Sequence, residues 1–220
     1  KNILSGMRAT NIIVLGSTNN GKIHEYKSLF AEYPEIEFKE LSDIVFNVNR
    51  LSIAETGATY YENAFNKGRL AHLAGKYPTI SDDSGLEVDA LDGKPGVFSD
   101  RFAEPGEFKN LGHDDANMQK LLKEMKSVPK EKRTARFTCT LVFFVEGVLL
   151  TATETLEGSI LETPRGTNGF GYDPVFFVAG TDKTLAEMSL EEKNKISHRA
   201  KALRSIMSQI KQNGIKLVRP

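Results

Sequence analysis

Residues 11–22 read NIIVLGSTNNGK, a short apolar run that passes through Gly16 into a polar loop. From Ile23 to Tyr33 the apolar residues recur at helical spacing, and Pro34 ends this pattern. The stretch therefore predicts a strand, a tight loop and a helix.

The rest of the first half continues to alternate between strand and helix patterns. Residues 36–41 alternate apolar and polar side chains as a half-buried strand does, and residues 43–57 predict a long loop. Residues 59–74 carry an apolar stripe at helical spacing, and we expect this helix to end at a left-handed Gly75.

The second half adds a hairpin to this alternation. Residues 136–160 predict two long antiparallel strands about a Glu146-Gly147 turn. A glycine-rich loop then leads into an apolar strand, and Ser189 with Glu192 forms a capping-box signature that begins a terminal helical region. Together the patterns predict a three-layer α/β fold with a mixed central sheet and a smaller lobe.

Length and composition narrow the class of protein. The 220 residues fit one large domain or two modest lobes. The hydrophobic fraction of 40% and the charged fraction of 26% are those of a folded globular chain rather than a disordered one. Basic and acidic residues number 29 each, so the chain lacks the positive field of a general nucleic-acid binder. We expect no nucleic-acid partner.

The single cysteine and the absence of long apolar runs bear on location. Cys139 alone cannot form an intramolecular disulfide, a cysteine zinc site or a Cys-x-x-Cys pair. No stretch approaches the ~20 apolar residues of a membrane span, and the first residues lack a long apolar signal core. We therefore expect a cytoplasmic location and no membrane partner. Residues 1–10 are expected to be a disordered lead or a remnant of expression.

The loop from Ser17 to Lys22 is the first candidate site. Backbone N–H groups at a helix start attract phosphate oxygens, and Lys22 adds a mobile positive charge. The spacing satisfies G-x-x-x-x-G-K, but Ile23 stands where a P-loop needs Ser or Thr to hold magnesium. The alternative is a tight turn without a ligand.

Asp82 and Asp83 form the second candidate site, at the end of a short apolar run. Adjacent side chains in an extended chain point to opposite faces, so the two carboxylates need not share a task. A carboxylate at a strand end can hold Mg²⁺ that is shared with substrate phosphates, or it can orient an attacking water. The alternative is an Asx turn that ends at Gly85.

The third candidate site is the loop Asn168–Pro174, which reads NGFGYDP. Glycines on both sides of Phe170 let the backbone approach a flat ligand, and an aromatic face can stack on a base. The alternative is that Phe170 and Tyr172 anchor the core beneath the loop.

The fourth candidate site combines Lys193, His198 and Arg199. Lys193 can offset phosphate charge, while His198 and Arg199 carry N–H donors that could read the carbonyl edge of a purine. The alternative is an exposed charged face of a helix.

Six stretches, taken together and in this order, resemble the inosine triphosphate pyrophosphatase family, the Ham1-like purine nucleotide pyrophosphatases. They are STNNGK at 17–22, ETGATYYENA at 55–64, SDDSGLEVDAL at 81–91, GKPGVFSDRF at 93–102, RGTNGFGYDPVF at 165–176 and EEKNKISHRAKAL at 191–203. The resemblance runs from about residue 11 to residue 210. Six ordered motifs are far more specific than any one of them.

The resemblance implies an elongated two-lobed α/β fold with a cleft between the lobes, formed by residues 11–212 and usually assembled as a homodimer. It implies Mg²⁺-dependent hydrolysis of ITP, dITP and XTP to the monophosphate and pyrophosphate. Alternatives are a P-loop-like NTPase that releases orthophosphate and a Maf-type nucleotide pyrophosphatase.

The resemblance also implies a role for each matching residue. Asp83 is implied as the catalytic and metal-binding carboxylate. The implied substrate contacts are Ser17, Thr18, Asn19, Asn20, Gly21, Lys22, Ser84, Phe170, Gly171, Tyr172, Asp173, Lys193, His198 and Arg199.

Two departures and one open question limit the carry-over from the family. Thr18 and Asn168 stand where glycine is usual, so the loop backbones there are expected to differ locally. Whether Asp43 or Asp82 is a second metal ligand stays open.

Overall fold

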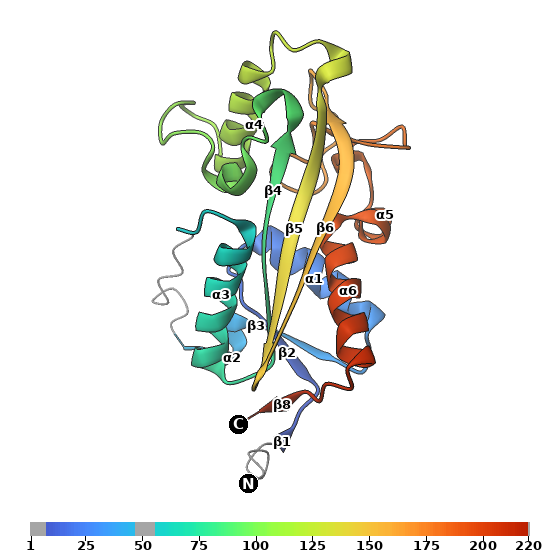
Figure 1. Ribbon diagram of the computed structural model, residues 1–220. Helices are drawn as coiled ribbons and strands as arrows, with labels where there is room; N and C mark the ends of the chain where they lie inside the picture. Colours follow the sequence, from blue (N-terminus) through green and yellow to red (C-terminus); the bar gives the residue numbers. More distant parts are fainter. Residues whose placement is uncertain (1–7, 47–55, 220) are drawn as a thin grey trace. The chain divides into compact units, whose positions relative to one another are not determined.

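A computed structural model describes residues 8–46 and 56–219 of the chain (Figure 1). Six strands form one sheet in the order β3-β2-β4-β5-β6-β7. β2 runs parallel to β3 and β4, whereas β6 and β7 are antiparallel, which confirms the predicted mixed sheet. The strands are β2 (Ile12–Leu15), β3 (Glu37–Glu40), β4 (Thr79–Val88), β5 (Thr134–Val145), β6 (Val148–Ile160) and β7 (Phe176–Val178).

Helices connect and cover these strands in the alternation that the sequence predicts. They are α1 (Asn20–Leu29), α2 (Leu41–Ile44), α3 (Tyr60–Gly75), α4 (His113–Glu124), α5 (Leu190–Ile196) and α6 (His198–Gln212). The predicted capping box is present at α5, where Ser189 Oγ accepts from the backbone of Glu192. None of the described helices combines the length and the apolar character needed to cross a bilayer.

The chain divides into two compact units. Unit 1 comprises Lys1–Asp83, Thr140–Thr153 and Arg199–Pro220, and unit 2 comprises Ser84–Cys139 and Glu154–His198. Strands β4, β5 and β6 each contribute residues to both units.

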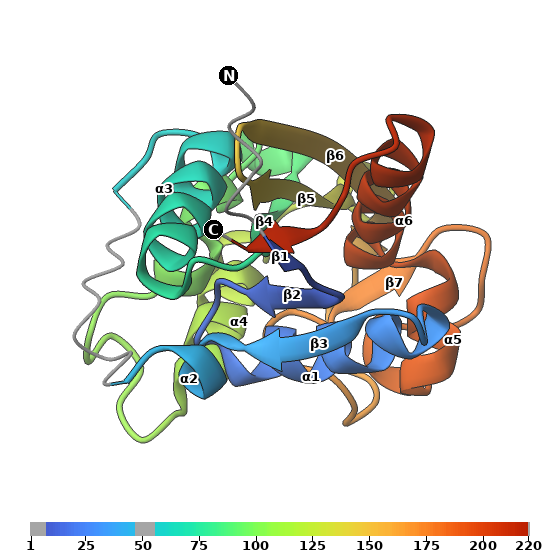
Figure 2. The ribbon, with the colours of Figure 1, turned by 90° about the horizontal axis from the view of Figure 1, so that it is seen from below.

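In unit 1, α3 covers one side of the strands while α1 and α6 cover the other (Figures 1 and 2). α3 packs closely against the strands because the face of the helix that points toward them carries small residues. A Cβ added at Gly68 would lie 2.6 Å from the ring of Phe144, and one added at Gly16 would lie 3.0 Å from Ala71. The three-layer arrangement predicted from the sequence is therefore present in this unit.

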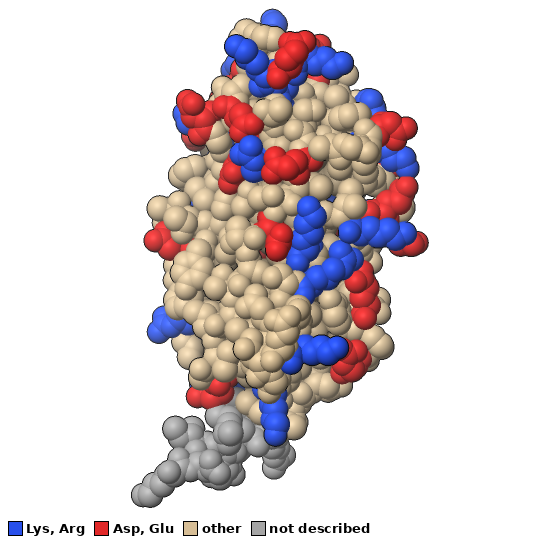
Figure 3. Space-filling model, turned by 45° about the vertical axis from the view of Figure 1, so that its right-hand side comes forward, with Lys and Arg blue, Asp and Glu red and all other residues tan. Residues whose placement is uncertain are grey.

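Unit 2 has an apolar core built from α4, strand residues and the segments on both sides of β7. Arg133 is buried among these elements, and its guanidinium donates to the carbonyls of Met125, Val128, Ile160 and Leu161. Five N–H donors in a planar fork can tie several chain segments together in this way. On the face drawn in Figure 3, acidic and basic side chains are interspersed, as the balanced charge of the chain predicts.

Three details differ from the sequence predictions. α3 ends with Gly75 inside the helix, and the left-handed residue is Lys76, at φ 59°. Residues 8–10 do not form a disordered lead, because β1 (Arg8–Ala9) pairs with β8 (Val218–Arg219) and Thr10 N donates to Leu217 O. The predicted loop 43–57 begins inside α2, and its residues 47–55 lie outside the described part of the chain.

Candidate active site

The loop between β2 and α1 has the predicted strand, loop and helix geometry. Asn19 caps α1 by accepting a hydrogen bond from Lys22 N at 3.0 Å, and Ser17 Oγ accepts from Asn19 N at 3.2 Å. Thr18 and Asn20 are exposed, and Gly21 lies in the first helical turn. The positive end of the α1 dipole therefore coincides with the loop that was predicted to bind phosphate.

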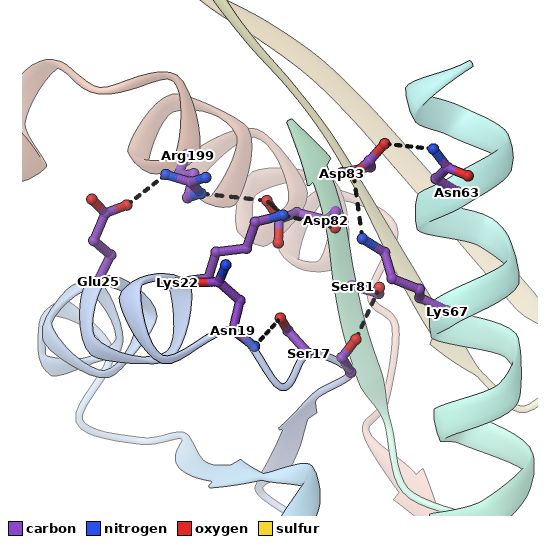
Figure 4. Close-up of polar contacts among 11 residues, drawn as sticks. Ser17, Asn19, Lys22, Glu25, Asn63, Lys67, Ser81, Asp82, Asp83 and Arg199 are labelled. Carbon is purple, nitrogen blue, oxygen red and sulfur yellow. Dashed lines mark hydrogen bonds and ion pairs between the residues drawn. The ribbon is translucent and has the colours of Figure 1, made fainter. Parts of the chain in front are cut away.

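Lys22 points from this loop toward β4 and enters a buried ion network (Figure 4). Its Nζ lies 3.1 Å from Asp82 Oδ2. Arg199 Nε, from α6, lies 3.3 Å from the same oxygen, and its Nη1 lies 2.9 Å from Glu25 Oε2 on α1. Burial by itself would raise the pKa of Asp82, but Lys22, Arg199 and Lys67 lower it well below its ordinary value. Asp82 therefore remains ionised in the interior.

Asp83 belongs to a second network that involves α3 (Figure 4). Its Oδ2 accepts from Asn63 Nδ2 at 2.9 Å, and its Oδ1 lies 3.3 Å from Lys67 Nζ. Asn63 and Lys67 are four positions apart, so they share one face of α3. Gly57 N donates to Asn63 Oδ1 at 2.7 Å, which fixes the orientation of the amide that faces Asp83.

The two aspartates face opposite sides of β4, as the alternation of an extended chain predicts. Their predicted place at a strand end was wrong, however. β4 continues to Val88, so Asp82 and Asp83 lie within a ten-residue strand, and no Asx turn forms at Gly85. Ser84 follows on the same strand and is half-buried.

The charges of these networks bear on metal binding. Three cations, Lys22, Lys67 and Arg199, balance three anions, Glu25, Asp82 and Asp83. The charges of these pairs therefore balance within the described part of the chain, and we expect a polyanionic triphosphate to bring a further charge-neutralising cation. The described residues include no group of three His, Cys, Asp or Glu side chains able to hold a metal by themselves.

Asp83 nevertheless fits a metal that is shared with a nucleotide. Mg²⁺ is usually held by one or two carboxylates together with substrate phosphates and waters, so a single protein carboxylate is a sufficient donor set. Asp43 is exposed on α2, where its Oδ2 accepts from Glu40 N in a capping box. Asp82 is engaged by two cations on the other face of β4. Neither residue therefore joins Asp83 in the structure.

In unit 2, the predicted base-binding loop is held by its own side chains and by α5. Lys193 pairs with Asp173 Oδ2, and its Nζ lies 5.3 Å from the centre of the Phe170 ring. Asp173 Oδ2 also accepts from Phe170 N at 3.0 Å. A Cβ at Gly169 would collide with this carboxylate, which explains the glycine there. Phe170 is half-buried.

Tyr172 lies in the apolar core, where its hydroxyl donates to Ser99 O at 2.8 Å. Burial is the main cause that raises the pKa of this phenol, so it stays protonated. Tyr172 therefore anchors the core beneath the loop, as the alternative interpretation of this segment predicted for both aromatic residues.

The members of the fourth predicted group make different contacts. Lys193 belongs with the Phe170 loop rather than with the phosphate loop. His198, the last residue of unit 2, is buried and stacks on Phe137 with ring centres 4.9 Å apart. Arg199 belongs to the Lys22 and Asp82 network of unit 1. None of the three lies on an exposed charged face, because each is at most 5% exposed.

Sequence reasoning missed Glu25, Asn63 and Lys67. A usable signal was present for two of them, because Asn63 and Lys67 fall on the buried face of α3 together with Ala64, Gly68 and Ala71. Polar residues on the buried face of a helix usually have a partner, and here the partner is Asp83.

Comparison with known proteins places this geometry in a family. The model of the Ham1 family matches residues 13–209. A dITP/XTP pyrophosphatase of Geobacillus kaustophilus is 48% identical over 198 residues, which are 90% of this chain and 93% of that protein. A dITP/XTP pyrophosphatase of Bacillus subtilis is 45% identical over 194 residues, 88% of this chain and 93% of that protein.

Solved structures agree with the sequence relatives. The Staphylococcus aureus Ham1 protein superposes with a TM-score of 0.76 at 35% identity, covering 92% of this chain and 99% of that one. A HAM1 protein from Coxiella burnetii superposes with a TM-score of 0.76 at 36% identity, covering 91% and 98%. Identity and fold thus agree over about nine-tenths of the chain, which belongs to the Ham1 family.

Proposed function

We propose that this protein hydrolyses the non-canonical purine nucleoside triphosphates ITP, dITP and XTP to the monophosphate and pyrophosphate. The observation that carries the proposal is the position of Asp83 beside Lys67, on the strand next to the phosphate-type loop that ends in Lys22. The relatives that bear the name dITP/XTP pyrophosphatase support the substrate class.

In the proposed reaction, a water oxygen attacks the α-phosphorus and the bond from this phosphorus to the bridging oxygen breaks. The bond electrons go to the bridging oxygen, which leaves as part of pyrophosphate, and the water's proton passes to Asp83 or to solvent. Lys67 pairs with the Asp83 carboxylate and orients it for this task. Lys22 and the start of α1 bind the phosphate oxygens and stabilise the charge that develops on them.

We propose Asp83 as the metal-binding residue, with Mg²⁺ as the ion. When bound, Mg²⁺ would neutralise phosphate charge and polarise the phosphorus for attack. The zero net charge of the buried network supports this proposal, since the protein's own cations are already balanced.

We also propose that the unit 2 loop binds the base. Phe170 would stack on the purine, and Gly171 and Asp173 would lie beside the base. Tyr172 and Lys193 would hold the loop in place. His198, five positions after Lys193 in the chain, is a further proposed substrate contact. Ser17, Thr18, Asn19, Asn20, Gly21, Ser84 and Arg199 remain proposed substrate contacts. The resemblance to the family further supports a homodimer, and the single cysteine supports a reducing compartment such as the cytoplasm.

A nucleotide panel tests the proposed function. Purified protein is incubated with ITP, dITP, XTP, ATP, GTP and pyrimidine triphosphates, with and without Mg²⁺, and the products are separated. We expect pyrophosphate and the monophosphate from the inosine and xanthosine nucleotides, and only with the metal. Orthophosphate would instead support the P-loop alternative, and a preference for other bases would support the Maf-type alternative. Light scattering of the same sample tests whether the mass is twice the 24.4 kDa of one chain.

A further inference from the structure

Phe170 lies between two peptide groups that are each fixed by a carboxylate. On its N-terminal side, Phe170 N donates to Asp173 Oδ2 at 3.0 Å. On its C-terminal side, Gly171 N donates to Asp114 Oδ2 at 2.9 Å. The peptide that joins Phe170 to Gly171 is also held at its carbonyl, which accepts from Asp173 N at 3.2 Å. Rotation of this peptide is therefore opposed at both ends.

The Gly171 contact connects two distant parts of unit 2. Asp114 lies in the first turn of α4, 57 positions before Gly171 in the chain. Acids in a first turn commonly cap their own helix, but the N-cap residue of α4 is Gly112, and the Asp114 carboxylate reaches the loop instead. Its other oxygen lies 3.3 Å from His113 Nδ1.

Gly171 has the conformation that makes this bond matter. Its φ is +61°, while a Cβ added there would meet no atom within 4 Å. The glycine is therefore required by the backbone conformation and not by lack of space. A backbone that can move between several φ regions needs an external contact to hold one of them, and Asp114 supplies that contact.

We propose that Asp114 is a positioning residue for nucleotide binding, which acts by holding the Gly171 peptide and thereby the ring of Phe170. This inference rests on the proposed role of the loop in binding the base. Asp173 is paired with Lys193 and fixes one side of Phe170 from within the loop. Asp114 fixes the other side from α4. Loss of Asp114 leaves the core and the Asp83 network in place, so the effect falls on binding of the base.

Steady-state kinetics with dITP test this role. In D114A we expect KM to rise about 3- to 10-fold with kcat within about twofold, because one partly exposed charge-assisted hydrogen bond is lost. D114N keeps an oxygen acceptor, so it should restore KM to within about twofold of the wild type. D115A is the matched control, since Asp115 is the next acid of the same helical turn and has no hydrogen bond to the loop in the described part of the chain. A D114A enzyme with the KM of D115A would overturn the proposal, as would a D114N enzyme as impaired as D114A.

A measurement without nucleotide separates this inference from the proposed function. Amide hydrogen exchange at Gly171, followed by NMR, should be about tenfold faster in D114A than in the wild type, and unchanged in D115A. Equal exchange in the wild type and D114A would refute the positioning role even if the protein hydrolyses dITP. If exchange is faster in D114A but the wild-type protein hydrolyses none of the tested nucleotides, the positioning role of Asp114 is supported and the proposed substrate is rejected.

Discussion

The two faces of β4 carry neighbouring residues of the same type in different surroundings. On one face, Asp82 is fully buried and contacts two cations, Lys22 and Arg199. On the other face, Asp83 contacts the ammonium of Lys67 and the neutral amide of Asn63. The strand alternation alone separates them, and the helices on each side determine what each carboxylate meets.

The difference indicates a division of labour. Asp82 pairs with both Lys22 and Arg199, so its main effect is to hold α1 and α6 against β4 and to place Lys22. Asp83 contacts the ammonium of Lys67 and the neutral amide of Asn63, and we propose that its carboxylate also binds a metal ion or a water. We therefore expect changes at Asp82 to act chiefly on stability and changes at Asp83 chiefly on turnover.

The largest expected effect is that of D83N on turnover. The variant keeps the size of the side chain but removes the negative charge that would bind the metal and orient the water. We expect kcat/KM for dITP to fall by about 1000-fold or more, roughly 4 kcal/mol of transition-state stabilisation. Circular dichroism and thermal unfolding should show a folded protein. Turnover within tenfold of the wild type would remove Asp83 from the catalytic role.

The next effect is that of D82N on stability. Removing this charge leaves Lys22 and Arg199 in the interior without their shared carboxylate, which costs about 3 kcal/mol of unfolding free energy. Urea unfolding at pH 7 measures the loss. E87Q is the matched control on the same strand, because Glu87 lies near the surface 3.8 Å from Arg136, and its loss should cost less than about 1 kcal/mol. Equal stability of D82N and E87Q would contradict the anchoring role of Asp82.

K67M tests the partner of Asp83 directly. The variant keeps an unbranched side chain against β4 but removes the ammonium 3.3 Å from Asp83 Oδ1. We expect kcat/KM for dITP to fall about 10- to 100-fold, since one charged group near the phosphates is lost. K39M, at a half-buried lysine of β3 that pairs with Glu37, should be as active as the wild type. Indistinguishable activities of K67M and K39M would place Lys67 outside the site.

The smallest effect is a pH dependence that belongs to Asp82 alone. Its pKa is lowered in the folded state from the ordinary value of 3.8, so its stabilising contribution is fully present well above pH 3.8 and is lost as the pH falls through 3.8 toward the folded pKa. The difference in unfolding free energy between wild type and D82N should therefore be constant from pH 8 to pH 5 and shrink below about pH 4. Urea unfolding series at each pH measure this difference. A difference that already shrinks between pH 7 and pH 5 would assign the titration to another group.

Local patterns were sufficient to predict much of the fold. The run before Gly16, the hairpin about Gly147 and the capping box of Ser189 each express a preference of a few adjacent residues, and all three are present in the structure. The end of α3 was harder, because Lys76 adopts the left-handed conformation that the pattern assigned to Gly75. Backbone conformation at a helix end depends on the segment that follows, which periodicity does not describe.

The candidate site was only partly predictable for a related reason. The alternation of β4 predicted that Asp82 and Asp83 face opposite ways, but not that α3 presents Lys67 to one of them. The contact from Asp114 to Gly171 joins residues 57 positions apart. Such contacts depend on how elements pack, so they follow from the structure and not from spacing along the chain.

The most direct test of the proposed chemistry is the fate of the attacking oxygen. dITP is hydrolysed in water enriched in ¹⁸O, and both products are analysed by mass spectrometry. Attack at the α-phosphorus predicts one ¹⁸O atom in the monophosphate and none in the pyrophosphate. Label in the pyrophosphate, or orthophosphate as the first product, would contradict the proposed reaction.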